Sequence, residues 1–512
     1  MALASRAVGY AGMGGRGGGG QRFPVCYNPY SCIQEIDPYS LEPLVLKKVL
    51  IPVVFLALSV ALVNCGGSSS SGARTSGIAF RAFVSNPVGG GVNIVNAETD
   101  VRATTVGPIS AGTTPSLMVV TPNRAQTLVF SPGSNLLNPE NALIIIDNTK
   151  ESSAGQAPLH FPTESMVVSP DSSVAYVAVP LENVAEQSQG AIELIGLTAS
   201  TFGLSVGEIA IPSVQYISIN NGGDRILAFS PNSDSIAVVT PSNLGTSSPV
   251  VTYVGGFDRP VQAFFSSDDT TAFVINCGAE CGGNQASVQQ FDMTTNTLGG
   301  SVAACAPAVP PNLAQCAGSF AVVNGSTMYL AGTPYMNNQP SQPCTGETTA
   351  AQTCGLLSII DLSSMTVTGN AIITDGYHDR MAMGANGQLF IGARTCTEIV
   401  PTDPPPPGAE VRGCLSIYNT LATAAGNVPA GGVVIPPVNG DVTGIQPIGT
   451  RDVVYVVQGY IVPGGSLFIY CAAIDANDNC PAVDAVQIAL PNNPTYAPLM
   501  VGNFYDVVTV DF

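Results

Sequence analysis

The sequence predicts an all-β protein, and three observations lead to this fold class. The chain has 55 glycines and 40 prolines in 512 residues, which is typical of many strands joined by many turns. Only 10% of the residues are charged, so the common helix formers Lys and Glu are scarce. Short runs rich in Val, Ile, Phe and Tyr recur from about residue 78 to the end of the chain. Together these features favour a repeated β architecture, which a chain of this length can form as one unit.

One strand pattern occurs eight times. Its copies begin about 45–65 residues apart and occupy residues 81–86, 127–132, 175–180, 226–231, 271–276, 327–332, 388–393 and 453–458. A second β-rich run follows each copy, a third follows most of them, and an inner run precedes seven. Four short strands per repeat predict a single β-propeller over residues 78–512, with eight four-stranded blades, or seven if one copy is irregular.

The two ends of this region are complementary. The first copy lacks an inner strand, whereas residues 505–512 (YDVVTVDF) form a strand with no repeat of their own. Pairing the C-terminal strand with the first copy would close the ring and cover both exposed sheet edges.

The segment SPDSSVAYVAV at residues 169–179 resembles the YVTN-type β-propeller repeat, in which a Pro-Asp-Gly-like turn leads into a strand containing Tyr-Val. The other copies are degenerate, and the resemblance covers about residues 78–512. It implies that the second-to-third strand loops and the links between blades share one face of the ring.

Residues 45–64 have the organisation of an export signal. Lys47 and Lys48 precede an apolar run at 49–63, which is short for a bilayer span but normal for a signal peptide. Cys65 follows, and residues 65–77 form a Gly/Ser-rich tether. The arrangement resembles a bacterial lipoprotein signal, which implies lipidation of Cys65 and an outer-membrane-anchored protein that faces the periplasm or the cell surface. A single uncleaved membrane anchor is the alternative.

Residues 1–44 precede this signal and do not belong to its pattern. They are Gly-rich and contain Cys26 and Cys32. We interpret them as a doubtful N-terminal extension and expect the true start near Val45.

The ten cysteines after Cys65 form five neighbouring pairs, each bracketing one loop of the repeat. The pairs are Cys277 and Cys281, Cys305 and Cys316, Cys344 and Cys354, Cys396 and Cys414, and Cys471 and Cys480. We expect disulfides, which agree with an exported protein, although other connectivities stay open. Zinc binding by these cysteines is disfavoured, because no CxxC motif occurs and no His lies near the first pair.

The long, cysteine-bracketed loops cluster in blades five to seven, and one of them contains the Pro-rich stretch 402–408. Insertions on one face of a repeat protein often mark a binding surface, and tolerance of surface insertions is the competing explanation.

The charge of the chain argues against one class of partner. The net charge is −19, and beyond residue 64 the chain has 32 acidic and 11 basic side chains. Such a surface repels phosphate backbones, so we expect no nucleic-acid partner.

The sequence has no GxSxG, HExxH, P-loop or CxxCH motif, and its only histidines are His160 and His378. His160 is interpreted as a structural residue of a link between blades. The predicted inner strands begin with charged residues, and such starts line the channel of a propeller. The candidate channel-mouth residues are Glu164, Asp258, Arg259, His378, Asp379, Arg380 and Asp441.

Four of these candidates, Glu164, Asp258, Asp379 and Asp441, are carboxylates that could form a ring holding calcium, as in propeller gluconolactonases. The alternative is that the Asp-Arg pairs cap strands and bridge blades. A second, weaker calcium candidate is the loop DANDNCP with Asp475, Asn477 and Asn479. Its Cys480 and Val486 depart from the calcium-loop pattern, so a disulfide-bounded hairpin loop is the alternative.

The leading functional hypothesis is a non-enzymatic binding or interaction scaffold at the bacterial envelope, without a cofactor. Its ligand would be an unknown protein, glycan or small molecule. The alternative is a propeller enzyme, either a calcium-dependent, lactonase-like hydrolase or a quinone-dependent dehydrogenase.

Overall fold

The protein's fold comes from a computed structural model of the chain. It describes residues 76–133, 140–183, 188–241, 250–305, 316–334, 355–384, 387–394, 396, 414–420, 433–436, 438, 440–449, 451–459, 465–471 and 496–511. Residues 1–71 form a separate unit that lies outside these ranges. The predictions for Cys65, for Cys344 and Cys354, for the stretch 402–408 and for the loop with Asp475, Asn477 and Asn479 therefore concern residues outside the described part.

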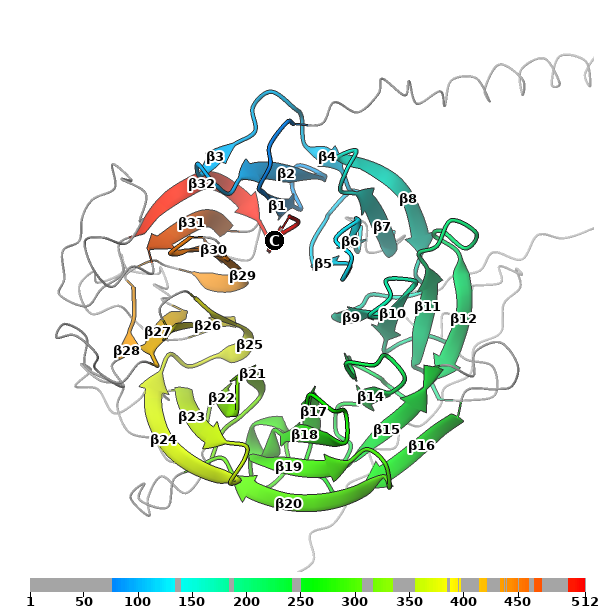
Figure 1. The fold of residues 1–512 in the computed structure, drawn as a ribbon, viewed down its shortest axis with the longest axis vertical. Coiled ribbons are helices and arrows are strands. Elements are labelled where there is room, and N and C mark those ends of the chain that lie inside the picture. The colour runs from blue at the N-terminus through cyan, green and yellow to red at the C-terminus, as the bar shows by residue number, and fades with distance from the viewer. Residues whose placement is uncertain are drawn as a thin grey trace, which may run out of the picture. The chain divides into compact units, whose positions relative to one another are not determined.

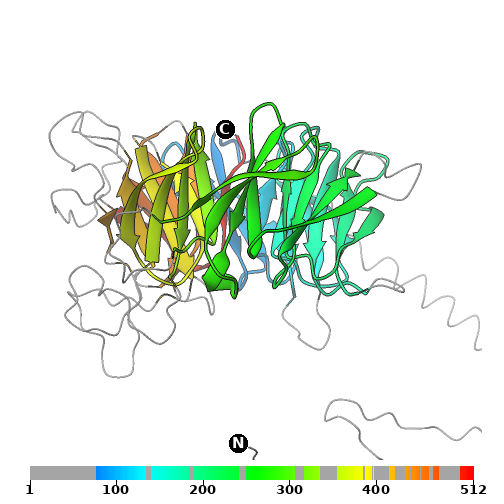
Figure 2. The same cartoon turned by 90° about the horizontal axis from the view of Figure 1, so that it is seen from below.

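The described strands form eight antiparallel sheets arranged as the blades of a propeller around a central axis (Figure 1). This confirms the predicted all-β propeller and decides for eight blades over seven. Figure 2 shows the same blades from the side, with their strands running across the thickness of the ring.

Blades are numbered in chain order, and the strands of each blade follow from the innermost to the outermost. Blade 1 contains β33 (Val507–Thr509), β1 (Arg81–Asn86), β2 (Gly91–Asn96) and β3 (Val101–Arg102) with β4 (Ile109–Ser110). Blade 2 contains β5 (Met118–Val120), β6 (Gln126–Ser131), β7 (Ala142–Asp147) and β8 (Ser152–Pro158), and blade 3 contains β9 (Ser165–Val168), β10 (Val174–Val179), β11 (Ala191–Gly196) and β12 (Ser205–Ala210). Blade 4 contains β13 (Tyr216–Ile219), β14 (Ile226–Phe229), β15 (Ser235–Thr240) and β16 (Val250–Gly255).

Blades 5 to 8 follow the same plan, and a short 3-10 helix, η2 (Gly278–Cys281), lies in blade 5. Blade 5 contains β17 (Pro260–Phe265), β18 (Thr271–Asn276), β19 (Ser287–Asp292) and β20 (Thr297–Ala303). Blade 6 contains β21 (Phe320–Asn324), β22 (Thr327–Gly332), β23 (Gly355–Asp361) and β24 (Thr366–Ile373), and blade 7 contains β25 (Tyr377–Met383), β26 (Gln388–Arg394), β27 (Leu415–Asn419) and β28 (Val433–Val434). Blade 8 contains β29 (Asp441–Ile448), β30 (Val453–Gly459), β31 (Gly465–Cys471) and β32 (Tyr496–Phe504).

The C-terminal strand closes the ring as the sequence predicts. Strand β33 is the innermost strand of blade 1, and it pairs with β1 through Ala82–Thr509, Phe83–Val508 and Val84–Val507. The last strand of the chain therefore supplies the inner strand that the first repeat lacks, and the two open edges cover each other.

The turn between the inner and second strands is built by side chains of the repeat. In blade 3, the Asp171 carboxylate accepts hydrogen bonds from the Ser169 hydroxyl (2.6 Å) and the Ser173 N–H (3.0 Å). Ser172, between them, has a φ of 62°. In blade 5, Asp268 binds the Ser266 hydroxyl at 2.6 Å in the same way. Short polar side chains thus stabilise a tight turn that the chain needs in each hairpin.

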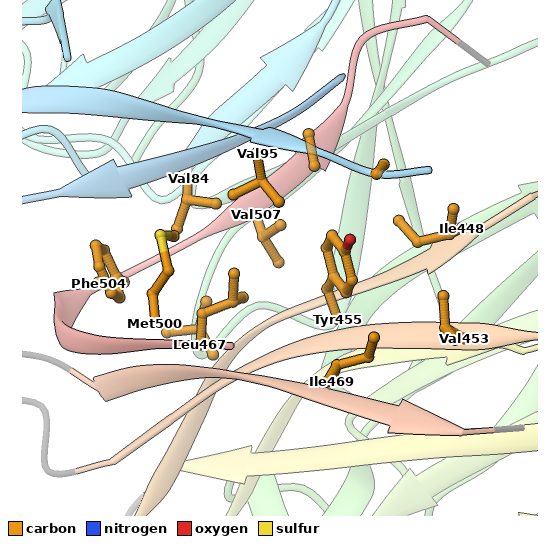
Figure 3. Packing of buried hydrophobic residues seen from close by; sticks show 13 residues of the cluster. Val84, Val95, Ile448, Val453, Tyr455, Leu467, Ile469, Met500, Phe504 and Val507 are labelled. Carbon is orange, nitrogen blue, oxygen red and sulfur yellow. The ribbon is translucent and has the colours of Figure 1, made fainter. Parts of the chain in front are cut away.

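The hydrophobic core lies between neighbouring blades rather than within one sheet. Figure 3 shows one such cluster, in which Val84 and Val95 of blade 1 pack with Tyr455 and Leu467 of blade 8 and with Val507. All five are at most 2% exposed. Burying a side chain of this size contributes roughly 1.5–3 kcal/mol, so the blade interfaces supply most of the stability of the ring.

Three of the five predicted disulfides lie within the described residues, and all three are formed: Cys277–Cys281, Cys305–Cys316 and Cys396–Cys414. Cys471 is also disulfide-bonded, although its predicted partner Cys480 lies outside the described part of the chain. The three bridges connect loops in blade 5, between blades 5 and 6, and in blade 7. The cysteine pattern thus predicted the correct pairing wherever both cysteines are described.

Candidate functional site

A cavity of about 750 Å³ lies where the inner strands begin and the second strands end. Its walls come from blades 2 to 8 and from the segment that leads into β33, so it occupies the centre of the ring (Figure 1). We call it the central cavity. Its size lies within the range of small-molecule pockets. Its polar side chains include Glu164, Tyr216, Arg259, Tyr377, Asp379, Arg380, Arg394 and Tyr505.

Asp379 is the centre of the charge arrangement in this cavity. Its Oδ2 accepts hydrogen bonds from Arg394 Nη2 and from Arg380 Nη1, the latter at 3.4 Å. Burial lowers the pKa of Arg394, but the adjacent Asp379 carboxylate outweighs this effect and raises the pKa, so the guanidinium stays charged. Asp379 Oδ1 is buried and has no hydrogen-bond partner among the described residues.

Asp506 supplies a second carboxylate, which interacts with the guanidinium of Arg380. Asp506 is buried and accepts hydrogen bonds from the Met118 N–H (2.8 Å) and the Val507 N–H (2.9 Å). Burial raises the pKa of Asp506 to about 6, against the opposing effect of nearby Arg380. Above this pH the charges of Arg380 and Arg394 are balanced by those of Asp379 and Asp506.

Two tyrosines meet across the cavity. The hydroxyls of Tyr216 in β13 and Tyr377 in β25 are hydrogen-bonded, although these strands belong to blades 4 and 7. The Arg394 guanidinium lies 5.5 Å from the centre of the Tyr377 ring, a favourable cation–π geometry. Tyr377 is nevertheless 39% exposed, so part of its ring faces solvent. Burial raises the pKa of both phenols, so both are neutral donors and acceptors.

His378 is sealed in the cavity wall. It is 1% exposed, and its Nε2 donates to the Thr374 carbonyl at 2.9 Å. Burial lowers the pKa of His378 to about 4, so the imidazole is neutral at physiological pH. This position suits a packing residue better than a proton-transfer group.

The predicted channel-mouth residues are therefore divided between two environments. Glu164, Arg259, His378, Asp379 and Arg380 do line the central cavity, as expected from their place at the starts of inner strands. Glu164, which is exposed, accepts a hydrogen bond from Gln215 Nε2 at 3.0 Å.

The expected ring of four carboxylates, however, does not assemble. Asp258 lies outside the cavity lining and accepts the N–H groups of Asn284 (2.9 Å) and Gln285 (2.8 Å), which fixes the loop after η2. Asp441 is buried beside the Cys414 sulfur at 3.5 Å and likewise does not line the cavity. Asp379 pairs with Arg380 and Arg394, which belong to its own blade 7.

Sequence reasoning overlooked Tyr216, Tyr377 and Arg394. Tyr216 and Tyr377 each begin an inner strand, so their position in the repeat was a usable signal for channel residues. Arg394 ends a second strand, and its role follows only from the fold.

Comparisons with known proteins support the fold alone. No family model and no curated protein matches the sequence, so the YVTN-type resemblance stays a prediction. Among solved structures, dihydro-heme d1 dehydrogenase NirN in complex with DHE is similar with a TM-score of 0.53 and 10% identity, over 85% of this chain and 75% of that one.

Two further structures show weaker similarity. A functionally unknown protein from Desulfotomaculum acetoxidans matches with a TM-score of 0.43 and 15% identity, over 69% of this chain and 98% of that one. Kuenenia stuttgartiensis hydrazine synthase matches with a TM-score of 0.41 and 15% identity, over 55% and 74% respectively. At these identities neither activity nor ligand can be transferred.

In the part of the chain that the structure describes, none of the helices is long and apolar enough to cross a bilayer.

Proposed function

We propose that this protein is an exported, lipid-anchored β-propeller that serves as a non-enzymatic binding protein at the bacterial envelope. We further propose that its central cavity binds a small, uncharged, polyhydroxylated molecule such as a saccharide. The predicted loop-rich face of blades five to seven has its longest loops outside the described residues, so the support for this proposal comes from the cavity.

The choice of an uncharged ligand rests on one observation, the balance of charge around the partly exposed Tyr377. The cavity wall has guanidinium groups at Arg259, Arg380 and Arg394, and each has a carboxylate nearby: Asp234 for Arg259, and Asp379 and Asp506 for the other two. An anionic ligand would meet these carboxylates, and a cation would meet the arginines. An uncharged ligand avoids both penalties.

The polar groups at the cavity surface suit hydroxyl groups. Glu164 is exposed and offers an acceptor, while the hydroxyl-lined wall at Tyr216 and Tyr377 offers both donors and acceptors. The exposed part of the Tyr377 ring provides a flat apolar surface for the C–H face of a sugar. Few polar groups around an aromatic platform are typical of small-molecule sites.

The side chains favour binding over catalysis. Acid–base catalysis needs a titratable group within reach of the substrate with a pKa near the working pH. His378 is neutral, buried and bonded to a carbonyl group, and Asp379 is held in ion pairs. The carboxyl groups of Asp506 and Glu280 have pKa values of about 6 and about 7, but these residues do not line the cavity. Because the four predicted carboxylates do not converge, the geometry also gives no support to the calcium-dependent hydrolase.

Calorimetric titration of the mature protein with a panel of mono- and disaccharides tests the ligand class. We expect saturable binding by at least one sugar, and the Tyr377→Ala variant should weaken it by about 10-fold or more, the equivalent of 1.4 kcal/mol. Tyr253→Ala is the matched control, since Tyr253 is 55% exposed on the outer strand β16. Binding of carboxylates or phosphates instead of sugars would show that the uncharged class is wrong.

The lipid anchor is tested separately. Replacing Cys65 with Ser in the native host should move the protein from the membrane fraction to the soluble periplasmic fraction, because two acyl chains or more are needed for stable anchoring. A Cys26→Ser variant is the control. Retention of the Cys65→Ser protein in the membrane would contradict the anchor and leave the cavity proposal intact.

A further inference from the structure

In blades 3, 6 and 7, the residue at one position of the third strand contacts the link that enters the same blade. In blade 7, Ser416 Oγ accepts a hydrogen bond from the Thr374 N–H at 2.9 Å. In blade 6, the Ser358 hydroxyl donates to the Ala304 carbonyl. In blade 3 the equivalent residue is Glu193, whose Oε1 accepts the His160 N–H at 3.1 Å. A hydroxyl group is therefore sufficient for this structural contact, and blade 3 uses a carboxylate.

Blade 3 adds two more ionisable groups at the same place. Glu182 follows β10, and its Oε2 lies 3.1 Å from Nδ1 of His160, while Oε1 of Glu193 lies 3.2 Å from the same nitrogen. The side chains of Glu182 and Glu193 are 5% and 2% exposed, whereas that of His160 is 62% exposed. Two buried carboxylates thus converge on one imidazole at the surface.

Within the described residues, the two buried carboxylates share one ion-pair partner, the exposed imidazole of His160. Glu193 Oε2 is buried and has no hydrogen-bond partner among the described residues. Glu182 Oε2 is also buried and, within the same residues, has an ion-pair distance to His160 but no hydrogen bond. Glu208 lies directly opposite Glu193 on β12, which adds a further carboxylate to the neighbourhood. Burial of like charges and of unpaired oxygens is costly, so a purely structural role would favour a serine, as in blades 6 and 7.

We propose that His160, Glu182 and Glu193 bind a divalent transition-metal ion, with zinc as the class that fits best. One ligand atom from each of the three residues lies within 4.8 Å of the other two. Atoms at this spacing can reach a common ion at about 2.0–2.2 Å with small side-chain adjustments. An imidazole nitrogen with two carboxylates matches zinc chemistry, whereas calcium prefers six to eight oxygens.

The proposed site has an accessible side. Because the His160 ring is largely exposed, the ion would have open coordination positions toward solvent. Three protein ligands with an open position are the pattern of zinc sites that bind an exogenous ligand. The two buried carboxylates would supply charge that the ion neutralises, which also removes their mutual repulsion.

Cys396, Cys414 and Asp441 also have suitable spacing, but they do not offer three available ligand groups. The two sulfurs are joined in a disulfide and are not available as thiolate ligands. The inference for blade 3 does not depend on the ligand of the central cavity.

The test uses the full mature protein with its disulfides oxidised, freed of metal with a chelator. Titration with cobalt chloride, read by visible absorption, and with zinc chloride, read by calorimetry, should each give one saturable site. His160→Ala, at an exposed position, should weaken zinc binding by at least about 10-fold. Glu193→Gln keeps the Oε1 acceptor for the His160 N–H and removes the charge, so it should weaken binding without loss of the fold.

Glu98→Gln, which changes an exposed carboxylate outside this cluster and outside the central cavity, is the control and should bind zinc as the unmodified protein does. Thermal unfolding of every variant verifies that it is folded. Undiminished zinc binding by both His160→Ala and Glu193→Gln would place the ion elsewhere and overturn the proposal. Absence of saturable binding by the unmodified protein would also overturn it.

Discussion

The guanidinium of Arg81 binds the carboxylate of Asp511 through two parallel hydrogen bonds, Nε to Oδ2 at 2.8 Å and Nη2 to Oδ1 at 2.6 Å. Arg81 begins the first strand of the ring, and Asp511 follows the last, so the contact joins segments 430 residues apart. A third donor, Arg81 Nη1, reaches Glu151 of blade 2 at 3.0 Å. The same side chain therefore fastens the closing strand and the neighbouring blade.

Replacing Asp511 with Asn should destabilise the closed ring. The pair is largely buried, with side-chain exposures of 11% and 19%, and a bidentate charged contact of this kind contributes more than a surface pair. We expect the free energy of unfolding to fall by about 1.5–3 kcal/mol. Urea denaturation of the variant and of the unmodified protein measures this difference in the free energy of unfolding.

Lys150→Ala is the matched control for this variant. Lys150 pairs with Asp147 on the surface, where its side chain is 72% exposed, so its loss should cost less than about 1 kcal/mol. If Asp511→Asn costs no more than Lys150→Ala, closure would depend on strand pairing and packing and not on the ion pair.

The disulfides should differ in their contribution to stability. Cys396 and Cys414 are 18 residues apart, whereas Cys277 and Cys281 are separated by 4. In the chain-entropy model, the longer loop gives about 3 kcal/mol and the shorter about 2 kcal/mol. Replacing both cysteines of each pair by Ala and comparing the denaturation midpoints should rank them in this order. The opposite order would mean that the short bridge fixes η2 and the loop after it in a way that entropy alone does not capture.

The sequence predicted the fold well because a propeller repeats its local pattern. Each blade has the same alternation of turn and strand, and the unmatched segment at 505–512 indicated how the ring closes. The disulfide pairs were equally readable, because each bracketed a single loop. These features depend on residues close together in the chain.

The site was less predictable because it depends on residues far apart in the chain. Tyr216 and Tyr377 are 161 positions apart and meet only because blades 4 and 7 face each other across the cavity. The two Asp-Arg pairs look alike in sequence, yet Asp258 holds a loop after η2 while Asp379 holds Arg394. Which partner each aspartate finds is decided by the neighbouring loops, which the repeat pattern does not encode.

Glu280 should make the ring less stable as the pH rises from about 4.5 to about 7, whereas His378, whose pKa burial lowers from 6.5 to about 4, should act in the opposite direction. Burial raises the pKa of Glu280 from 4.5 to about 7, although its carboxylate accepts hydrogen bonds from the Thr333 N–H at 3.0 Å and the Ser319 hydroxyl at 3.2 Å. In this window the Glu280 carboxyl group binds more protons in the folded protein than in the unfolded chain, so its contribution to the free energy of unfolding decreases with rising pH. Asp506, whose pKa is raised to about 6, acts in the same direction.

Glu280→Gln should remove part of this decrease, because the amide cannot ionise. We expect the unfolding free energy at pH 7.5, relative to that at pH 4.5, to be higher in the variant than in the unmodified protein by about 1–3 kcal/mol. Urea denaturation at several pH values measures the slope, and exposed Glu98→Gln is the control that should leave it unchanged. An unaltered slope in Glu280→Gln would mean that Glu280 ionises near its ordinary pKa.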